Sequence, residues 1–222
     1  EEEKSVPKLD EFYVDIGAKD KAGAEALVSL GDVAAFDSTA GEFGSGLFQG
    51  KALGSRVGCA VLLTLLKEEL PLDCTFVFTA QEEVGNRGAF GAGFSVTPEL
   101  ALVLDGADTA DAPGVPAHKR SCTPGKGVVL PVMDKGSIAD RGLFERLRTL
   151  AERETILWQT SGSIPGRTDA AALQRTKAGV RTAMLSVPVR YHHTPSGLVS
   201  LGDVDGVLAL TRAFLSDLAE KE

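Results

Sequence analysis

Residues 74–85, Cys-Thr-Phe-Val-Phe-Thr-Ala-Gln-Glu-Glu-Val-Gly, determine the fold and chemistry that this sequence predicts. The first half is a short apolar run rich in β-branched and aromatic residues, which predicts a buried strand at residues 75–79. Glu82 and Glu83 follow where that strand should end. Because side chains alternate in direction along an extended backbone, the two carboxylates are aimed at different targets. One carboxylate can bind a metal ion while the other accepts and donates a proton.

Apolar runs and amphipathic segments alternate on both sides of this stretch. We expect further strands at residues 100–104, 128–132 and 182–187, and helices at residues 55–70, 142–152, 169–177 and 203–219. Near-continuous apolar strands between amphipathic helices are typical of a mostly parallel sheet covered on both faces. The sequence therefore predicts an α/β sandwich for residues 51–222.

The first 50 residues have a different character. They contain two strand-like pieces, at residues 12–16 and 32–36, a helical turn near residues 22–28, and a glycine-rich stretch at residues 41–50. This is too little apolar material to close a hydrophobic core alone. We expect residues 1–50 to be part of a separate, smaller domain.

Composition excludes several classes of protein. The net charge of −8 argues against nucleic acid or an anionic membrane as the main partner, since both require a basic surface; solubility is the simpler reading of that charge. The three cysteines are widely spaced and indicate neither a disulfide framework nor a zinc knuckle. No apolar stretch reaches the roughly 18 residues of a membrane span, and the acidic start does not resemble a signal peptide. We expect a cytoplasmic protein.

Polar residues follow three of the predicted strands. Glu82 and Glu83 come after the first, Asp105 ends the second, and His193 follows the strand at residues 182–187. Glu, Asp and His are the ligands of zinc, cobalt or manganese, and a hydrolytic site needs a further carboxylate that takes a proton from water.

Each of these residues also has a simpler interpretation. Glu82 and Glu83 alone are typical of a solvated turn, Asp105 before a glycine is typical of turn chemistry, and His193 is typical of a surface loop. Their joint occurrence at three strand ends makes a metal site about as well supported as these alternatives.

Eight segments, in order along nearly the whole chain, carry a family resemblance. They are Tyr13-Val-Asp-Ile-Gly17, Lys51-Ala-Leu53, Arg56-Val-Gly-Cys59, Phe76-Val-Phe-Thr-Ala-Gln-Glu-Glu-Val-Gly85, Leu102-Val-Leu-Asp105, Ala112-Pro-Gly114, Thr168-Asp-Ala170 and Arg190-Tyr-His-His193. The sequence closely resembles the di-metal aminopeptidases that assemble into tetrahedral dodecamers. That group includes glutamyl and deblocking aminopeptidases and proteins once labelled endoglucanase M.

The resemblance implies a particular domain organisation. It implies a catalytic α/β domain into which a small, PDZ-like β-barrel is inserted for oligomer contacts. Residues 1–50 then correspond to the C-terminal part of the barrel, and residues 51–222 to the C-terminal part of the catalytic domain. The partners implied are peptide substrates and other copies of the same chain.

The resemblance also implies roles for individual residues. Glu82 corresponds to the general base, Glu83 and His193 to the ligands of one metal, and Asp105 to a ligand of the other. The cofactors implied are two zinc or cobalt ions per subunit. Asp169 and Arg190 correspond to groups behind the ligands or beside the substrate, although packing or loop closure explains them about equally well.

Two departures from the family pattern concern the metal site. Family members place an aspartate shared by both metals directly after Lys-Ala-x, where this chain has Gly54. A further ligand, the histidine of a His-x-Asp motif, precedes the barrel in the family, and neither His118 nor His192 stands in that context. Loss of an anionic bridging ligand weakens the binding of two dications, so we expect one metal ion or none here.

Two hypotheses of function follow. The first is a metal-dependent aminopeptidase that retains Glu82, Glu83, Asp105 and His193, with activity weakened or lost in this chain. The second is a non-catalytic relative or fragment that acts as an oligomer subunit, a regulator or a scaffold. Gly54 favours the second for present activity, whereas the intact glutamate and histidine motifs favour the first for ancestry.

Overall fold

A computed structural model describes residues 7–161 and 166–220, so the acidic start of the sequence lies outside it. The chain divides into two compact units, Glu1–Asp37 and Ser38–Glu222. We describe each unit by itself.

The described part of the first unit contains a short 3-10 helix, η2 (Leu9–Glu11), and one helix, α1 (Lys21–Glu25). Helix α1 begins where the Asp20 carboxylate accepts a hydrogen bond from the N–H of Gly23 at 2.8 Å. The strands expected at residues 12–16 and 32–36 do not form, and that prediction was wrong. A strand needs a partner, and within this unit the apolar side chains of both pieces are exposed.

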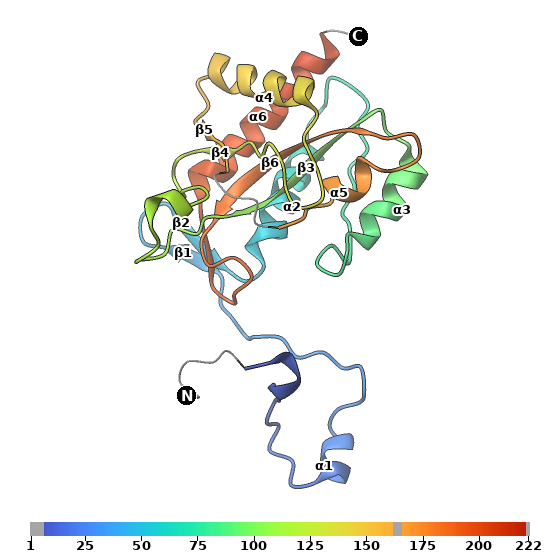
Figure 1. The fold of residues 1–222 in the computed structure, drawn as a ribbon, viewed down its shortest axis with the longest axis vertical. Helices are drawn as coiled ribbons and strands as arrows, with labels where there is room; N and C mark the ends of the chain where they lie inside the picture. The colour runs from blue at the N-terminus through green and yellow to red at the C-terminus, as the bar shows by residue number, and fades with distance from the viewer. Residues whose placement is uncertain (1–6, 162–165, 221–222) are drawn as a thin grey trace. The chain divides into compact units, whose positions relative to one another are not determined.

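The second unit is built on a four-stranded sheet (Figure 1). Its strands, in the order β3-β6-β4-β5, are β3 (Leu100–Asp108), β6 (Arg181–Val189), β4 (Val128–Val129) and β5 (Trp158–Gln159). The pairs β3–β6 and β4–β5 are parallel, whereas β4 meets β6 in antiparallel fashion at Val129 and Ser186. The sheet is therefore mixed. The expected α/β class is confirmed, but the sheet is less uniformly parallel than the sequence predicts.

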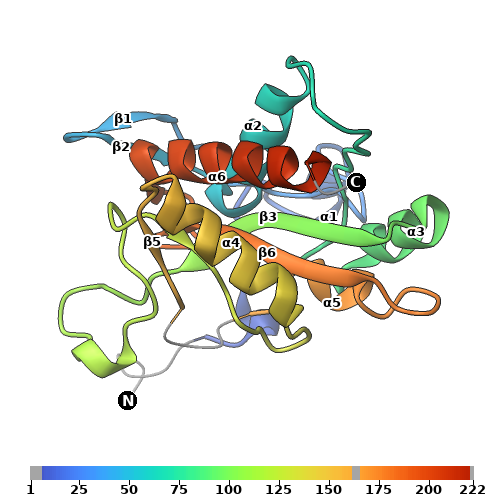
Figure 2. The same cartoon turned by 90° about the horizontal axis from the view of Figure 1, so that it is seen from above.

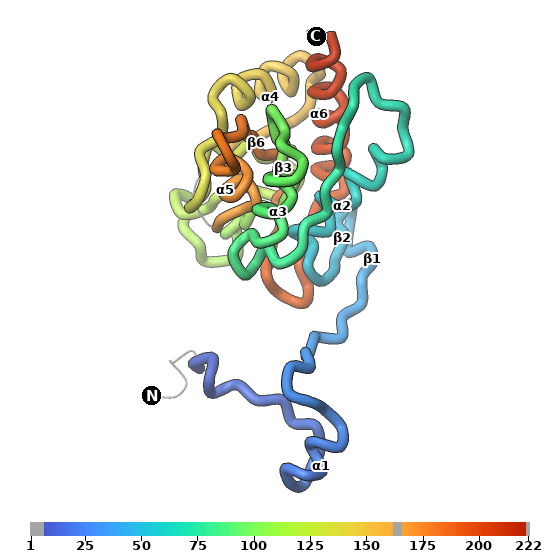
Figure 3. Tube along the Cα trace, turned by 90° about the vertical axis from the view of Figure 1, so that its right-hand side faces the viewer, coloured from blue at the N-terminus to red at the C-terminus, as the bar shows by residue number. Residues whose placement is uncertain are grey.

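Helices cover both faces of this sheet (Figures 2 and 3). Side chains of β6 alternate between two apolar clusters: Leu185 and Val187 belong to the cluster that includes the three longer helices, whereas Met184 packs with Ala170. The helices of the first face are α2 (Leu53–Leu65), α4 (Arg141–Arg153) and α6 (Leu201–Ala219); those of the second face are α3 (Arg87–Val96) and α5 (Ala170–Leu173).

A second, smaller sheet joins the glycine-rich stretch to the larger part of the chain. Strands β1 (Gly41–Phe43), β2 (Leu47–Gly50) and β7 (Gly197–Ser200) pair antiparallel in that order. Residues 41–50 thus pair with a strand that leads directly into α6. The assignment of residues 1–50 to part of a β-barrel stays a prediction.

Two sequence predictions near the candidate site need correction. Residues 75–79 do not form a strand, because no neighbouring strand among the described residues pairs with them. Asp105 does not end its strand, since the parallel pairing of β3 with β6 continues to Asp108 and Val189.

The predicted helices 55–70 and 169–177 end earlier, at Leu65 and Leu173, and α3 was not predicted. In the part of the chain that the structure describes, no helix has the length and apolar character needed to cross a membrane.

Candidate functional site

Glu82 and Glu83 lie in a tight turn between residues 74–79 and helix α3. The backbone N–H groups of Gly85 and Asn86 both donate to the carbonyl oxygen of Glu82, at 3.0 and 2.9 Å. Gly85 and Asn86 have φ values of +114° and +56°, a left-handed conformation that glycine and asparagine tolerate best. The Gly-Asn pair therefore closes the tight turn that begins at Glu82 and carries both carboxylates.

Two of the three predicted ligands touch one another. The His193 Nε2 atom lies 3.3 Å from the Glu83 Oε1 atom, and both side chains are about two-thirds exposed. His193 comes from the loop after β6, where it has a φ of +59°. The fold thus brings Glu83 and His193 together from positions 110 residues apart in the sequence.

Glu82 and Asp105 are less exposed than this pair and share one cavity. Burial raises the pKa of Asp105 to about 6, although the N–H of Gly106, which donates to its carboxylate at 2.8 Å, opposes the rise. Burial also raises the pKa of Glu82 to about 7, and the charges of Asp105 and Glu83 add to that rise. The three predicted carboxylates are therefore close enough to disfavour simultaneous ionisation.

Asp169 belongs to the same group of side chains through Asn86, a residue that the sequence analysis missed. The Asn86 amide donates to Glu82 at 3.0 Å and to Asp169 at 3.3 Å, and Thr79 Oγ1 donates to the other Asp169 oxygen at 2.5 Å. Asn86 is only 3% exposed. Its position directly after Gly85 predicts a turn and carries no signal of this second contact, which depends on a residue 83 positions later.

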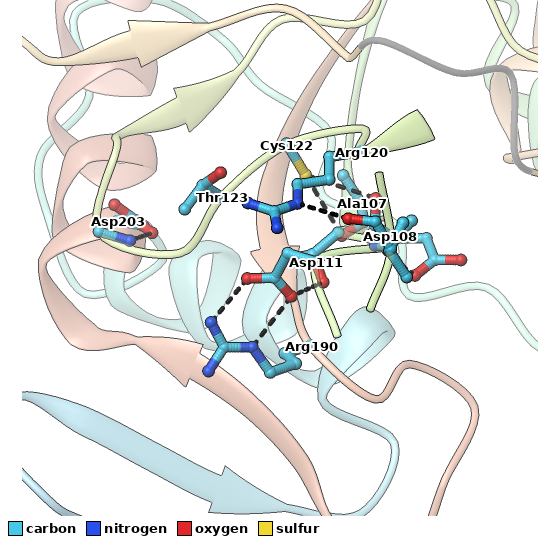
Figure 4. A network of polar contacts seen from close by, with 12 residues as sticks. Ala107, Asp108, Asp111, Arg120, Cys122, Thr123, Arg190 and Asp203 are labelled. Carbon is cyan, nitrogen blue, oxygen red and sulfur yellow. Dashed lines mark hydrogen bonds and ion pairs between the residues drawn. The ribbon is translucent and has the colours of Figure 1, made fainter. Parts of the chain in front are cut away.

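Arg190 pairs with a further carboxylate, that of Asp111 (Figure 4). Its guanidinium forms a bidentate ion pair with Asp111, with N–O distances of 2.9 and 2.6 Å, and Thr109 donates to the same carboxylate at 2.7 Å. The Arg190 hydrogen bonds hold the pKa of Asp111 below its usual range. Of the two interpretations offered for Arg190, this geometry favours loop closure.

Replacing Asp111 by asparagine should destabilise the chain. We expect the free energy of unfolding at pH 7 to fall by about 1–2 kcal/mol, because the charge-assisted bonds to Arg190 are lost. The native pKa of Asp111 is lowered, so its contribution is present above the unfolded pKa of about 3.9 and disappears as pH falls through the native value. Urea unfolding at pH 7 and below pH 4 tests this; Glu99→Gln, at an exposed carboxylate, is the control. A difference between Asp111→Asn and the unchanged chain that stays constant down to acid pH would contradict the prediction.

Gly54 has a structural consequence that the sequence did not reveal. It lies in the first turn of α2, and a Cβ atom added there would stand 2.3 Å from the His192 Nε2 atom. The His192 ring stacks on the ring of His193, with centroids 4.0 Å apart and an angle of 17° between the planes. The imidazole of His192 therefore fills the space into which a side chain at position 54 would project.

The candidate donors differ in which of them contact one another among the described residues. Within residues 7–161 and 166–220, no three His, Cys, Asp or Glu side chains are arranged so that they could hold a metal ion together. Glu83 and His193 offer two donors, and catalytic zinc sites use three protein ligands. Gly54 offers no donor. The contact between Glu83 and His193 therefore brings together two of the donors that the family resemblance implies.

Comparisons with known proteins agree with the fold and with the family resemblance. A family profile described as M42 glutamyl aminopeptidase matches residues 1–210. A putative aminopeptidase of Acetivibrio thermocellus is 35% identical over 91% of this chain and 61% of its own length. The lysyl aminopeptidase of Pyrococcus furiosus is 29% identical over 94% of this chain and 60% of its own length.

Solved structures give the same result. An aminopeptidase from the archaeon Desulfurococcus kamchatkensis superimposes with a TM-score of 0.90 at 34% identity, covering 96% of this chain and 61% of that chain. The TET1 peptidase of Pyrococcus horikoshii, described as assembling into a tetrahedron or a large octahedral shell, gives a TM-score of 0.75 at 28% identity and covers 96% and 66%.

The α/β sheet and these likenesses place the chain among the aminopeptidase families. The chain belongs to the M42 glutamyl aminopeptidase family, as the sequence motifs indicated. The family is metal-dependent. The chain spans about three-fifths of the length of the relatives it matches.

Proposed function

We propose that the function represented by this chain is the removal of N-terminal residues from peptides, with Glu82 as the residue that transfers the proton. The observation that carries the proposal is the position of Glu82. It lines the same cavity as Asp105, and its neighbour Glu83 contacts His193. A hydrolytic site requires this combination of one carboxylate for proton transfer and separate oxygen and nitrogen donors.

The surroundings of Glu82 support this role. Burial, reinforced by the charges of Asp105 and Glu83, raises the pKa of Glu82 to about 7, where a carboxylate can both accept and return a proton. The amide of Asn86 orients one of its oxygens. Asp169, which bonds to the same amide, is proposed to hold Asn86 in place.

We propose that the activity of the 222-residue chain alone is weakened or lost, with one metal ion or none bound. Gly54 supplies no carboxylate, His192 occupies the adjacent space, and only Glu83 and His193 are in direct contact. Without a carboxylate at position 54, the positive charges of two metal ions are less well compensated, so each ion binds more weakly.

A second function is supported by the same contacts. The His192 ring fills the space in which a carboxylate at position 54 would bind a metal ion. If no metal ion binds for this reason, the chain serves as a non-catalytic subunit of an assembly. The relatives' ability to form closed shells, as the Pyrococcus horikoshii peptidase does, supports association of several copies. Peptide hydrolysis remains the preferred proposal, because Glu83 contacts His193 and Glu82 lines the same cavity as Asp105.

Zinc titration and peptide hydrolysis test the two proposals together. We expect calorimetry to show at most one weakly bound zinc ion per chain, and aminoacyl-p-nitroanilides with added zinc or cobalt to be hydrolysed slowly. Glu82→Gln should lower any such rate by about 100-fold or more, because it removes the proton-transfer group and keeps the shape of the side chain.

Two outcomes would count against these proposals. Tight binding of two zinc ions with rapid hydrolysis would contradict the proposed impairment. A rate that Glu82→Gln leaves unchanged would contradict the role of Glu82 and favour the non-catalytic function.

A further inference from the structure

The sequence contains one asparagine, Asn86, and its side chain lies between two carboxylates. The Nδ2 atom is 3.0 Å from the Glu82 Oε1 atom and 3.3 Å from the Asp169 Oδ1 atom. Because Asn86 is only 3% exposed, its amide depends on protein groups for its hydrogen bonds. The two protons of one NH₂ group thus bridge carboxylates from two distant parts of the chain.

The backbone conformation of Asn86 does not account for this side chain. Its φ of +56° is left-handed, a conformation that asparagine tolerates and glycine adopts most easily. Glycine would therefore serve the turn equally well. The turn also requires no contact with Asp169, which lies 83 positions later in the sequence. The amide group consequently needs an explanation of its own.

A carboxamide has a donor end and an acceptor end, and rotation of the group by 180° exchanges them. In the structure the NH₂ end of Asn86 faces Glu82. The opposite orientation would direct a carbonyl oxygen at Glu82, and an ionised carboxylate has no proton to donate to it. Whether Glu82 is held as a carboxylate that can accept a proton thus depends on which end of the Asn86 amide faces it.

Asp169 determines that orientation. Its Oδ1 atom accepts a hydrogen bond from Asn86, and its Oδ2 atom accepts one from Thr79 Oγ1 at 2.5 Å. Asp169 is 9% exposed and lies directly before helix α5. Both of its oxygens act as acceptors here, so a flipped Asn86 amide would turn its own oxygen toward two acceptors at once. The contact with Asp169 therefore disfavours the flipped amide.

We propose that Asn86 and Asp169 are positioning residues for Glu82. Asp169 keeps the Asn86 amide in one orientation, and the amide holds Oε1 of Glu82. The Oε2 atom is then the oxygen that takes a proton from the attacking water and returns it to the leaving amine. This inference rests on peptide hydrolysis as the proposed function and assigns its proton transfer to one atom.

Hydrolysis of an aminoacyl-p-nitroanilide by the 222-residue chain with added cobalt tests the positioning. Asn86→Gly removes the amide and keeps a residue suited to the φ of +56°. We expect kcat to fall about 10- to 100-fold, the equivalent of one hydrogen bond to a charged group. KM should change by less than about twofold, because a buried residue that acts through Glu82 does not bind the substrate.

A double-mutant cycle separates positioning from a general effect on structure. Asp169→Asn should lower kcat by a similar factor, because an amide at position 169 can donate to a flipped Asn86 amide. In the Asn86→Gly background, the same substitution should change kcat by less than about twofold, since Asp169 acts through Asn86. Two independent structural defects would add instead.

Thr176→Val is the control for loss of a buried hydrogen bond near α5. The Thr176 side chain is buried and donates to the carbonyl oxygen of Ala172 at 3.1 Å. We expect kcat to stay unchanged in this variant. An equal fall in kcat would show that hydrolysis responds to any loss of packing in this region, and would contradict the positioning role.

Nuclear magnetic resonance gives a readout that needs neither a metal ion nor turnover. Because the sequence has one asparagine, labelling with ¹⁵N-asparagine gives one pair of side-chain NH₂ signals. We expect both protons to exchange with solvent at least about tenfold more slowly than those of asparagine in an unstructured peptide. Glu82→Gln should shift one of the two signals, and Asp169→Asn should shift the other.

Two further results would overturn the proposal. Side-chain protons of Asn86 that exchange as fast as in an unstructured peptide would show that the bridge does not form. Additive losses of kcat in the double variant would show that Asp169 does not act through Asn86. A chain that hydrolyses no anilide would instead contradict the proposed function, and the exchange rates would then decide by themselves whether the bridge forms.

Discussion

Gly54→Asp combined with His192→Ala should bind zinc at least about tenfold more tightly than the unchanged chain, a gain of about 1.4 kcal/mol. An aspartate at position 54 adds a carboxylate to a site that now has two donors in contact, Glu83 and His193. Removal of the His192 ring opens the space that the new side chain needs, since a Cβ at position 54 would otherwise stand 2.3 Å from the His192 Nε2 atom.

The two single variants separate the causes. Gly54→Asp alone should raise the zinc affinity less than the double variant does, because the new side chain must displace His192, whose ring stacks on His193. His192→Ala alone should change the affinity little, since it adds no donor. Calorimetric titration of all four chains with zinc measures these differences. If the double variant binds no better than His192→Ala, position 54 does not face the metal site.

Gly58→Ala should lower the free energy of unfolding by about 2–3 kcal/mol, the upper range for overpacking a close-packed contact. A Cβ at Gly58 would come within 2.4 Å of the Leu104 carbonyl oxygen. That oxygen is backbone in β3, which is held by parallel pairing with β6 and cannot move as a side chain would. Helix α2 must therefore shift away from the strand that carries Asp105.

Gly91→Ala is the matched control for this prediction. Gly91 also lies inside a helix, α3, but a Cβ there meets no atom within 4 Å. Alanine in an open helical position should stabilise the chain by about 0.5–1 kcal/mol, because glycine has the lower helix propensity. Urea unfolding of both variants should give changes of opposite sign. Equal effects would show that the contact between α2 and β3 is looser than the structure indicates.

The pattern of apolar runs and helical segments predicted the α/β class, because that pattern depends on the period of the side chains along each element. It also predicted β6 and α6 closely, since both are long and apolar on their buried sides. The strand at residues 75–79 was predicted from equally strong local signals but does not form. A strand requires a neighbour, and no local pattern reports whether that neighbour is present.

The candidate site was predictable to the same limited extent. Glu82, Glu83, Asp105 and His193 were chosen because polar residues follow strands, and the contact between Glu83 and His193 fits that choice. Their roles as base and ligands stay predictions.

The amino-acid sequence by itself determined the family, the α/β class and the identity of the candidate side chains, because motifs and periodicity are properties of neighbouring residues. Only the tertiary structure decided that the His192 ring fills the space beside Gly54 and that Asn86 joins Glu82 to Asp169. The contacts of Gly54 with His192 and of Asn86 with Asp169 join residues 83 or more positions apart, and packing in three dimensions alone sets such distances.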